Sequence, residues 1–373
     1  MYYTPADRTL LHCIPIAAPA TRRQARELER KVQVSFGFVP QYYAQHLGIR
    51  FGREWHENCE YRYETLIKMK TFLHQTFPHV EAFYPRDNGH GFDADCATLS
   101  GVYGSKVLPL IFGCDVCFPE DDWPNDATTE HFSKESLREL IKYVALNNNP
   151  FIIRIKEQME HMKKTFGQVE GYMNYQGVLN TALKLRGNDI FIDMLEDENF
   201  VDELFGKIAD VIEKTAKWIQ SYQRKSGFDI DMLSLSNCVV NMISPKLYER
   251  FVLPHDKRLA SEFPRFGIHT CNWNVTPYLE SIRQIPYLGY LDMGSMSDIS
   301  KARRMFPESR LAVMYSPVDF VMKSLTELEA DMCEIVRKAM PCDIVLADLT
   351  EETEAERLNH VLHYIARLGD EIE

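Results

Sequence analysis

The sequence predicts an α/β protein whose strands and helices form a single (β/α)8, or TIM, barrel. Eight short apolar segments, rich in β-branched and aromatic residues, are separated by segments with helical periodicity. This alternation is typical of a barrel of parallel strands. A doubly wound open sheet is the main alternative, but no glycine-rich dinucleotide fingerprint or P-loop follows a predicted strand. Because no internal repeat or flexible linker interrupts the pattern, we expect one domain over residues 1–373.

A charged helix is predicted ahead of the barrel, over residues 21–30, as an N-terminal helical extension. Thr21 is a suitable N-cap, and the charged residues after it are typical of a solvated helix. The first strand is predicted at residues 32–40, where a β-rich segment ends at a proline. The proline-interrupted segment 107–113 and the acidic loop 118–126 are expected to form an insertion over one face of the barrel.

The other elements follow from the same periodicities. Helical periodicity covers residues 52–77 and 197–225, and it returns in a C-terminal helix that reaches Leu368. The remaining seven strands are predicted at residues 80–85, 169–175, 230–236, 265–271, 287–292, 310–315 and 343–348. Strand and helix alternate most regularly after residue 169, which favours the barrel.

The composition is that of a cytoplasmic protein. Hydrophobic residues make up 45% of the chain and charged residues 26%. The formal net charge of −12 argues against nonspecific binding to nucleic acid, which needs a basic face. No apolar segment approaches the roughly 18–20 residues of a membrane helix, and the N-terminus lacks the pattern of a secretory signal. The 9 scattered cysteines are typical of reduced thiols in the cytoplasm. We therefore expect a cytoplasmic enzyme.

The predicted strand that begins at Arg265 ends in two side chains that can bind a metal, His269 and Cys271. Residues two apart in a strand point to the same face, so these two would project together. Imidazole nitrogen and thiolate sulfur are both good zinc ligands. Alone, such a pair is more often a core cysteine beside a hydrogen-bonded histidine, so the interpretation depends on what the other strands contribute.

Other strand ends carry residues that fit a site, because a barrel's active site lies at the C-terminal ends of its strands. Asp292 and Asp348 each close an apolar strand, where an aspartate is either a helix N-cap or an inward-facing metal ligand. Asp87, Asn174 and Tyr315 lie at further strand ends, and we predict them as catalytic residues.

Two further cysteine positions bear on the same site. Residues 236–238, which include Cys238, also belong to the predicted rim, although we assign them no role. Cys342 stands at the start of the last strand, and a strand of about six residues spans roughly 20 Å. We therefore expect Asp348, and not Cys342, to reach the metal.

The chain resembles the uroporphyrinogen decarboxylase-like superfamily, whose members are (β/α)8 barrels. The resemblance covers most of the chain from the first strand onward. It rests on residues 92–97, 103–107, 175–177, 183–187, 243–254 and 269–271. The most specific part is the Ser-Pro…Phe-x-x-Pro segment that precedes His-x-Cys.

Within that superfamily the chain is most similar to the cobamide-dependent methyltransferases. The decarboxylases carry an Arg-Gln-Ala-Gly-Arg segment just after strand one, whereas residues 41–46 contain no arginine and Arg23-Gln24-Ala25-Arg26 precedes the strand. The methyltransferases hold zinc on His-x-Cys, a cysteine at the end of the last strand and often an acidic ligand. His269 and Cys271 match that motif, and Asp292 falls where the acidic ligand is expected. Asp348 stands in place of the second cysteine.

The resemblance implies a zinc-dependent methyltransferase that works with a separate corrinoid (cobalamin) protein, because this chain has no Asp-x-His-x-x-Gly cobalamin signature. The partners would be that corrinoid protein and a small methyl donor or acceptor. One His, one Cys and two Asp form a hard ligand set, which favours an oxygen-bearing donor such as an aryl methyl ether, and hence an O-demethylase. In the other direction of transfer, a thiol would accept the methyl group from the corrinoid protein.

Two alternatives remain open at the level of the sequence. One is a metal-free decarboxylase in which Arg86 and Asp87 bind and protonate a carboxylated substrate. The other is a noncatalytic binding protein on an enzyme scaffold. The sequence does not fix the oligomeric state, and a homodimer is one of the assemblies that we consider.

Overall fold

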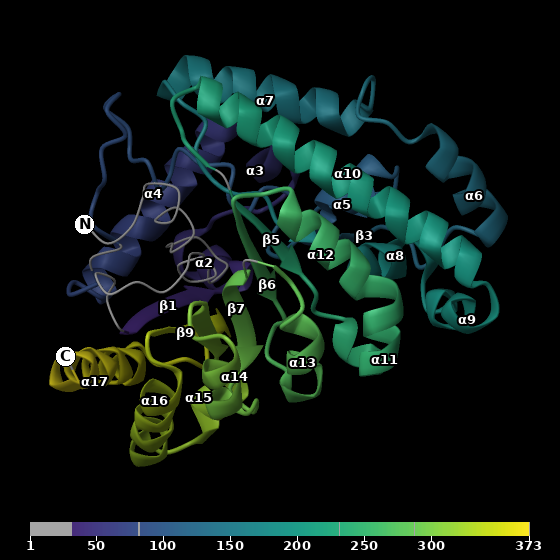
Figure 1. The fold of residues 1–373 in the computed structure, drawn as a ribbon. Coiled ribbons are helices and arrows are strands. Elements are labelled where there is room, and N and C mark those ends of the chain that lie inside the picture. Colours follow the sequence, from purple (N-terminus) through teal and green to yellow (C-terminus); the bar gives the residue numbers. More distant parts are fainter. Residues whose placement is uncertain (1–31, 81–82, 231, 287, 373) are drawn as a thin grey trace.

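The computed structural model describes residues 32–80, 83–230, 232–286 and 288–372. The helix predicted over residues 21–30 lies outside these ranges, as do two residues of the predicted second strand. Within them, helices surround a central group of strands (Figure 1), and no helix of this part of the chain is long and apolar enough to cross a membrane.

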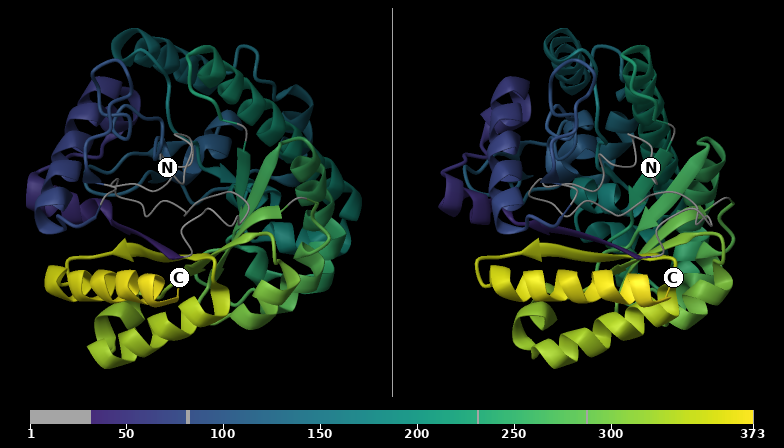
Figure 2. Two further views of the ribbon diagram at one scale, coloured as in Figure 1. Left: turned by 60° about the vertical axis from the view of Figure 1, so that its left-hand side comes forward. Right: turned by 90° about the vertical axis from the view of Figure 1, so that its left-hand side faces the viewer.

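Seven parallel strands form the main sheet, in the order β1-β9-β8-β7-β6-β5-β4. Their bounds are β1 Val32–Phe38, β4 Tyr175–Gln176, β5 Met232–Ser236, β6 Arg265–His269, β7 Leu288–Gly294, β8 Arg310–Met314 and β9 Cys342–Leu349. Figure 2 shows β1 beside β9, so the first and last strands of the described chain are neighbours. Together with the helices, this sheet makes the architecture an α/β barrel of the (β/α)8 type.

The segment around Thr98 takes the position of the second strand, next to the chain that leads into β4. Thr98 pairs with Glu170 in a parallel bridge, and the Leu99 N–H donates to the Glu170 carbonyl at 2.9 Å. The Tyr172 N–H then donates to Ser100 Oγ at 3.0 Å. These contacts continue one parallel alignment, so residues 98–100 follow the course of a barrel strand.

The prediction of a strand at residues 80–85 is therefore wrong in its described part. The Phe83 N–H donates to the Val80 carbonyl at 3.1 Å, which closes a turn after helix α4 (Cys59–Thr76). The ring of Phe83 packs edge-on against Phe36 at 5.4 Å between centroids. The apolar residues of this segment belong to an aromatic cluster in a turn, and their alternation does not reflect a strand.

The helices match most of the predicted ones. They are α2 Pro40–Leu47, α3 Arg53–Glu57, α4 Cys59–Thr76, α5 Val107–Ile111, α6 Lys134–Tyr143, α7 Pro150–Phe166, α8 Val178–Arg186, α9 Asp189–Glu196, α10 Glu198–Lys225, α11 Pro245–Leu247, α12 Leu253–Ser261, α13 Leu279–Ile282, α14 Ile299–Met305, α15 Pro317–Met322, α16 Leu325–Ala339 and α17 Ala355–Ile372. The helix predicted over residues 52–77 is divided at Asn58, whose side chain accepts from the Glu60 and Tyr61 N–H groups and so starts α4.

The segment predicted as an insertion is divided between two elements. α5 packs against α7, α8 and β4, so it belongs to the barrel wall. A short antiparallel hairpin follows, formed by β2 Val116–Cys117 and β3 Asn125–Asp126. Pro109 falls near the start of α5, where the missing N–H costs little.

The inside of the barrel is filled by side chains from alternate strand residues. Tyr290, Ala312, Met314, Val345 and Ala347 form a separate buried cluster from β7, β8 and β9. The glycine at position 267 of β6 makes room for the largest of them, because a Cβ there would lie 2.2 Å from Tyr290 Cδ1. A second, larger apolar core lies between the strands and the helices.

Candidate metal centre

Three side chains that can bind a metal meet at the C-terminal ends of β5 and β6. Ligand atoms of Cys238, His269 and Cys271 all lie within 4.8 Å of one another. Nε2 of His269 is 3.0 Å from Sγ of Cys271. A hydrogen bond between the two cysteine side chains lowers the pKa of Cys238 and raises that of Cys271. The three side chains are partly buried, so the cluster opens toward solvent.

His269 is the last residue of β6, and its ring is held from behind by β7. Strand register places His269 opposite Asp292. Nδ1 of His269 lies 2.8 Å from Oδ2 of Asp292, which also accepts from the Tyr290 hydroxyl at 3.1 Å. Burial opposes protonation of His269, but the Asp292 charge and the neighbouring sulfurs raise its pKa well above the ordinary value. In the metal-free protein this favours the doubly protonated ring, whereas in the neutral ring a proton on Nδ1 would leave the Nε2 lone pair facing Cys271.

Cys271 reaches the cluster through a turn, which differs from the strand that we predicted. β6 ends at His269, and Cys271 has a left-handed backbone with φ of 61°. The loop folds over the end of β7, where a Cβ at Gly294 would lie 2.7 Å from the Trp273 nitrogen. The Thr270 hydroxyl donates to the Asp292 carbonyl at 2.7 Å and fixes the same loop. The two predicted ligands are brought together, but by backbone curvature and not by strand alternation.

Cys238 follows β5 and is brought in by strand pairing. Ser236 is the register partner of His269, and the Asn237 N–H donates to the His269 carbonyl at 2.7 Å. The sequence placed residues 236–238 at the rim but gave Cys238 no role. The available signal was a cysteine two residues after the strand that precedes His-x-Cys, which becomes informative only when the two strands are known to be neighbours.

The two predicted aspartate ligands lie outside this group of three. Asp292 is fully buried behind His269, and its Oδ1 has no hydrogen-bond partner within the described chain. Asp348 is exposed and has φ of 55° near the end of β9. Desolvation of the carboxyl group raises the pKa of Asp348, and the charge of His269 lowers it. The carboxylate therefore lies close enough to the His269 ring to interact with its charge.

Cys342 is the first residue of β9 and is fully buried. It pairs with Val32 and Leu311, which are the first and second residues of their own strands. This places its sulfur at the opposite end of the barrel from His269, where the sequence predicted it.

The predicted catalytic residues at the rim have different environments. Asn174 accepts hydrogen bonds from Ser236 Oγ and Gln176 Nε2, each at 3.0 Å, so it lies beside the end of β5 and near the cluster. The hydroxyl of Tyr315 instead donates to Asp331 of α16. The structure therefore places Asn174 at the rim beside the end of β5 and turns the Tyr315 hydroxyl toward α16.

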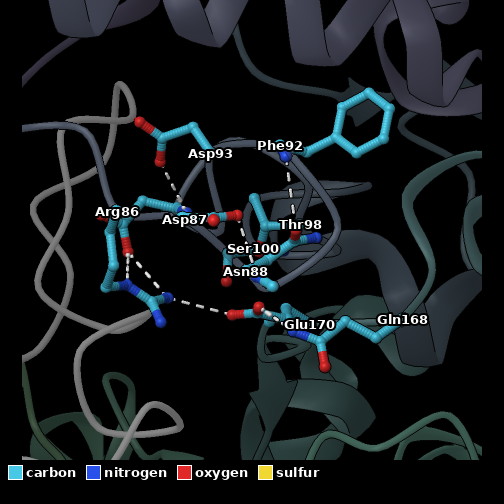
Figure 3. A network of polar contacts seen from close by, with 12 residues as sticks. Arg86, Asp87, Asn88, Phe92, Asp93, Thr98, Ser100, Gln168 and Glu170 are labelled. Carbon is cyan, nitrogen blue, oxygen red and sulfur yellow. Dashed lines mark hydrogen bonds and ion pairs between the residues drawn. The ribbon is translucent and has the colours of Figure 1, made fainter.

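Asp87 lies away from the cluster, in the network of Figure 3. Its Oδ1 accepts from the N–H groups of Gly89 and Gly91 in a loop, at 2.9 and 3.2 Å. The preceding Arg86 binds Glu170 at 3.0 Å, and Glu170 stands at the start of the chain that leads into β4. Because the second strand begins near residue 98, Asp87 precedes that strand and does not follow it. The structure does not bring Asp87 to the rim.

The fold and the cluster together define a barrel enzyme with a candidate metal centre at the C-terminal ends of its strands. The family model described as uroporphyrinogen decarboxylase (URO-D) matches residues 99–347, which is most of the chain. The chain therefore belongs to the uroporphyrinogen decarboxylase family. No curated protein sequence matches it.

Solved structures show the same fold. The methyltransferase from Methanosarcina mazei is similar over 92% of this chain and 94% of that chain, with a TM-score of 0.62 and 14% identity. A proposed vitamin-B12 independent methionine synthase from Listeria monocytogenes covers 61% of this chain and 70% of that chain, with a TM-score of 0.34 and 14% identity. The first likeness shows a shared fold, and the second is too weak to support an argument.

Proposed function

We propose that this protein is a zinc-dependent methyltransferase that moves a methyl group between a separate corrinoid protein and a small thiol. The observation that carries the proposal is the cluster of Cys238, His269 and Cys271 at the barrel rim. Two thiols and one imidazole are a zinc donor set, and three protein ligands leave one position open, as in catalytic zinc sites. The contact between Nδ1 of His269 and Asp292 is the usual support of a histidine that binds metal through Nε2.

The donor set changes the substrate class that we favour. The set inferred from sequence contained two carboxylates and favoured a methylated oxygen compound, whereas the cluster contains two sulfurs. Sulfur ligands are soft and suit thiolate chemistry. When bound, zinc would supply Lewis acidity that lowers the pKa of a thiol acceptor at the open position. An aryl methyl ether donor is therefore the less favoured substrate.

The chain's own residues would prepare this site in two ways. Asp292 holds the proton on Nδ1 of His269, so that Nε2 faces the metal position. Asn174 lies at the same rim with its Oδ1 fixed by Ser236 and Gln176, and we propose it as a contact for the substrate. Asp348, exposed at the mouth, would contact whatever occupies the open position.

The surface around the mouth supports a protein partner. Met242, Met296, Val318 and Met322 lie on the segments that follow β5, β7 and β8, and they are 55%, 62%, 67% and 78% exposed. We call these four residues the apolar rim. Exposed apolar groups mark interaction sites where they form a contiguous patch, and methionine adapts its shape to a partner. We propose that the corrinoid protein docks on the apolar rim, because its cofactor must reach the cluster beneath.

The decarboxylase alternative has less support. Arg86, which would bind a substrate carboxylate, already binds Asp95 at 3.1 Å and Glu170 at 3.0 Å. α2, the helix after β1, contains no arginine or lysine. Arg86 is therefore already paired with carboxylates of the protein, and α2 has no arginine or lysine that could bind a carboxylated substrate.

The direct test is methyl transfer from methylcobalamin to small thiols by the purified protein. We expect turnover with a thiol acceptor that is abolished by a chelator and restored by zinc. As a second arm, aryl methyl ethers are offered with reduced cobalamin. Turnover of ethers alone would overturn the assignment of a thiol, and carbon dioxide release from a porphyrinogen substrate without metal would overturn the methyltransferase.

A further inference from the structure

The buried carboxyl group of Asp256 lies in α12. It contacts Asn237, the residue that precedes Cys238 in the chain. Asp256 is fully buried, and its Oδ2 accepts from Asn237 Nδ2 and from the Tyr248 hydroxyl, both at 2.9 Å. In the described ranges no lysine, arginine or histidine pairs with it, and its Oδ1 has no hydrogen-bond partner. Burial raises the pKa of Asp256 to about 7, against the effect of the two hydrogen bonds.

Such a group is not explained by stability. A carboxyl group held in the core by neutral donors alone is costly, because the charge is desolvated without a cation and the neutral form leaves an oxygen unpaired. Even a buried ion pair can often be replaced with apolar side chains of similar volume at no cost, and within the described ranges Asp256 lacks a cation that would offset its desolvation. The role of Asp256 therefore depends on the side chain that it binds.

Asp256 holds Asn237, the residue before Cys238. The side chain of Asn237 is 2% exposed, and its Nδ2 donates to Asp256 while its Oδ1 has no partner in the described chain. Space for this side chain is provided by Gly177, where a Cβ would lie 1.9 Å from Asn237 Oδ1. The Asn237 N–H meanwhile donates to the His269 carbonyl. Both ends of Asn237 are thus fixed.

The residue after Cys238 is fixed as well. The Val239 N–H donates to Asn180 Oδ1 at 3.2 Å, and Asn180 belongs to α8. Cys238 therefore lies in a turn whose two flanking residues are anchored to helices on the outside of the barrel. On the strand side, the same turn is joined to the backbone of His269.

We propose that Asp256 and Asn237 are positioning residues that direct the Cys238 sulfur toward the metal position. This inference rests on the proposed function, because it assumes that Cys238 is a ligand. Asp256 touches neither metal nor substrate, and it acts through the Asn237 amide. Tyr248 supports it by donating to the same carboxylate oxygen.

The test compares zinc affinity and cobalt spectra of variants. Asp256→Leu removes the acceptor for Asn237, whereas Asp256→Asn keeps an oxygen that can accept from Nδ2. Asp193→Leu is the matched control, since Asp193 is a buried carboxylate on α9 that binds Arg186 and Lys134. Affinity is measured by competition with a chromophoric chelator, and sulfur coordination by the thiolate-to-cobalt absorption after Co(II) loading.

We expect Asp256→Leu to weaken zinc binding about 10–100-fold and to lower the thiolate-to-cobalt absorption toward that of Cys238→Ala. Asp256→Asn should restore both readouts, and Asp193→Leu should lose stability but keep the parental affinity and spectrum. Asn237→Ala should match Asp256→Leu, and the double variant should be no worse than either, because the two act as one unit. Asn237→Ala also tests the inference if Asp256→Leu does not fold.

Two results would overturn the inference in distinguishable ways. If Asp256→Leu and Asn237→Ala bind zinc and Co(II) as the parent does, the positioning role is wrong while the metal site stands. If the parent itself binds neither ion, the proposed function is wrong, and the positioning role falls with it.

Discussion

Nδ1 of His269 lies 2.8 Å from Oδ2 of the fully buried Asp292, on the side of the ring that faces away from Cys238 and Cys271. Register between β6 and β7 places the two residues opposite each other. The sequence suggested Asp292 as a ligand, whereas under the proposed function this contact would make it a group that orients His269. The distinction can be measured, because losing a ligand and losing a supporting carboxylate have different effects.

Asp292→Asn should weaken zinc binding about 10–100-fold without changing the stoichiometry, because the amide no longer favours the proton on Nδ1. Chelator competition and metal analysis measure the two quantities. Asp348→Asn is the control, since Asp348 lies outside the group of three, and it should retain parental affinity. A parental affinity in Asp292→Asn would show that Asp292 does not support the metal, and loss of metal in Asp348→Asn would make Asp348 a ligand, as the sequence suggested.

Glu170 gives the free energy of unfolding a dependence on pH. It is 1% exposed, and burial raises its pKa to about 7, against the effect of Arg86. Between about pH 4.5 and about pH 7 the folded state holds a proton that the unfolded state has released, so stability falls as pH rises through this window. Asp256 contributes in the same direction.

Glu170→Gln should therefore reduce the loss of stability between about pH 5.5 and about pH 8, by roughly 1–3 kcal/mol. Urea unfolding at the two pH values measures this difference. Glu334→Gln is the control, because Glu334 is an exposed residue of α16. A pH dependence in Glu170→Gln that equals the parental one would show that Glu170 is ionised in the folded protein at both values.

Gly267→Ala should destabilise the protein by roughly 1–3 kcal/mol, because the added Cβ would lie 2.2 Å from Tyr290 Cδ1 inside the barrel. Gly206→Ala on α10 is the matched change, since nothing lies within 4 Å of a Cβ there. In a helix interior that change should be neutral or stabilise by roughly 0.5–1 kcal/mol. Equal effects of the two substitutions would contradict the packing of the Tyr290 ring against Gly267 of β6.

The later strands could be predicted closely from the sequence, because their apolar residues are buried on both faces. β8 and β9 begin and end within one residue of the predicted strands at 310–315 and 343–348. The second strand could not be predicted from the sequence, because its place is taken by a segment around Thr98 and Ser100 whose polar residues give no strand pattern. The aromatic turn at residues 83–85 instead showed a pattern that wrongly indicated a strand.

The candidate site was only partly predictable for a related reason. His269 and Cys271 are close in sequence, so the motif is visible without a fold. Cys238 joins them only through the pairing of Ser236 with His269, and that register is a property of the sheet. The side-chain direction of Asp348 was equally hidden, because its left-handed backbone departs from the alternation that the strand pattern implies.

Met296→Glu and Met322→Glu, both on the apolar rim, should raise the KM for a methylated corrinoid protein about tenfold or more, because each buries an unpaired carboxylate in the interface. Turnover with free methylcobalamin and the zinc content should not change. Leu195→Glu is the control, since Leu195 is 72% exposed but lies on α9. An increase in KM for Leu195→Glu alone would place the docking surface elsewhere.

Whether Cys238, His269 and Cys271 bind one zinc ion is decided by the zinc content of purified Cys238→Ala and Cys342→Ala beside the parent. The two cysteines differ in position, because Cys238 lies in the cluster and Cys342 at the far end of β9. We predict one zinc per chain in the parent and in Cys342→Ala, and a large loss in Cys238→Ala. Full zinc content in Cys238→Ala, or loss of zinc in Cys342→Ala, would exclude this set of three ligands.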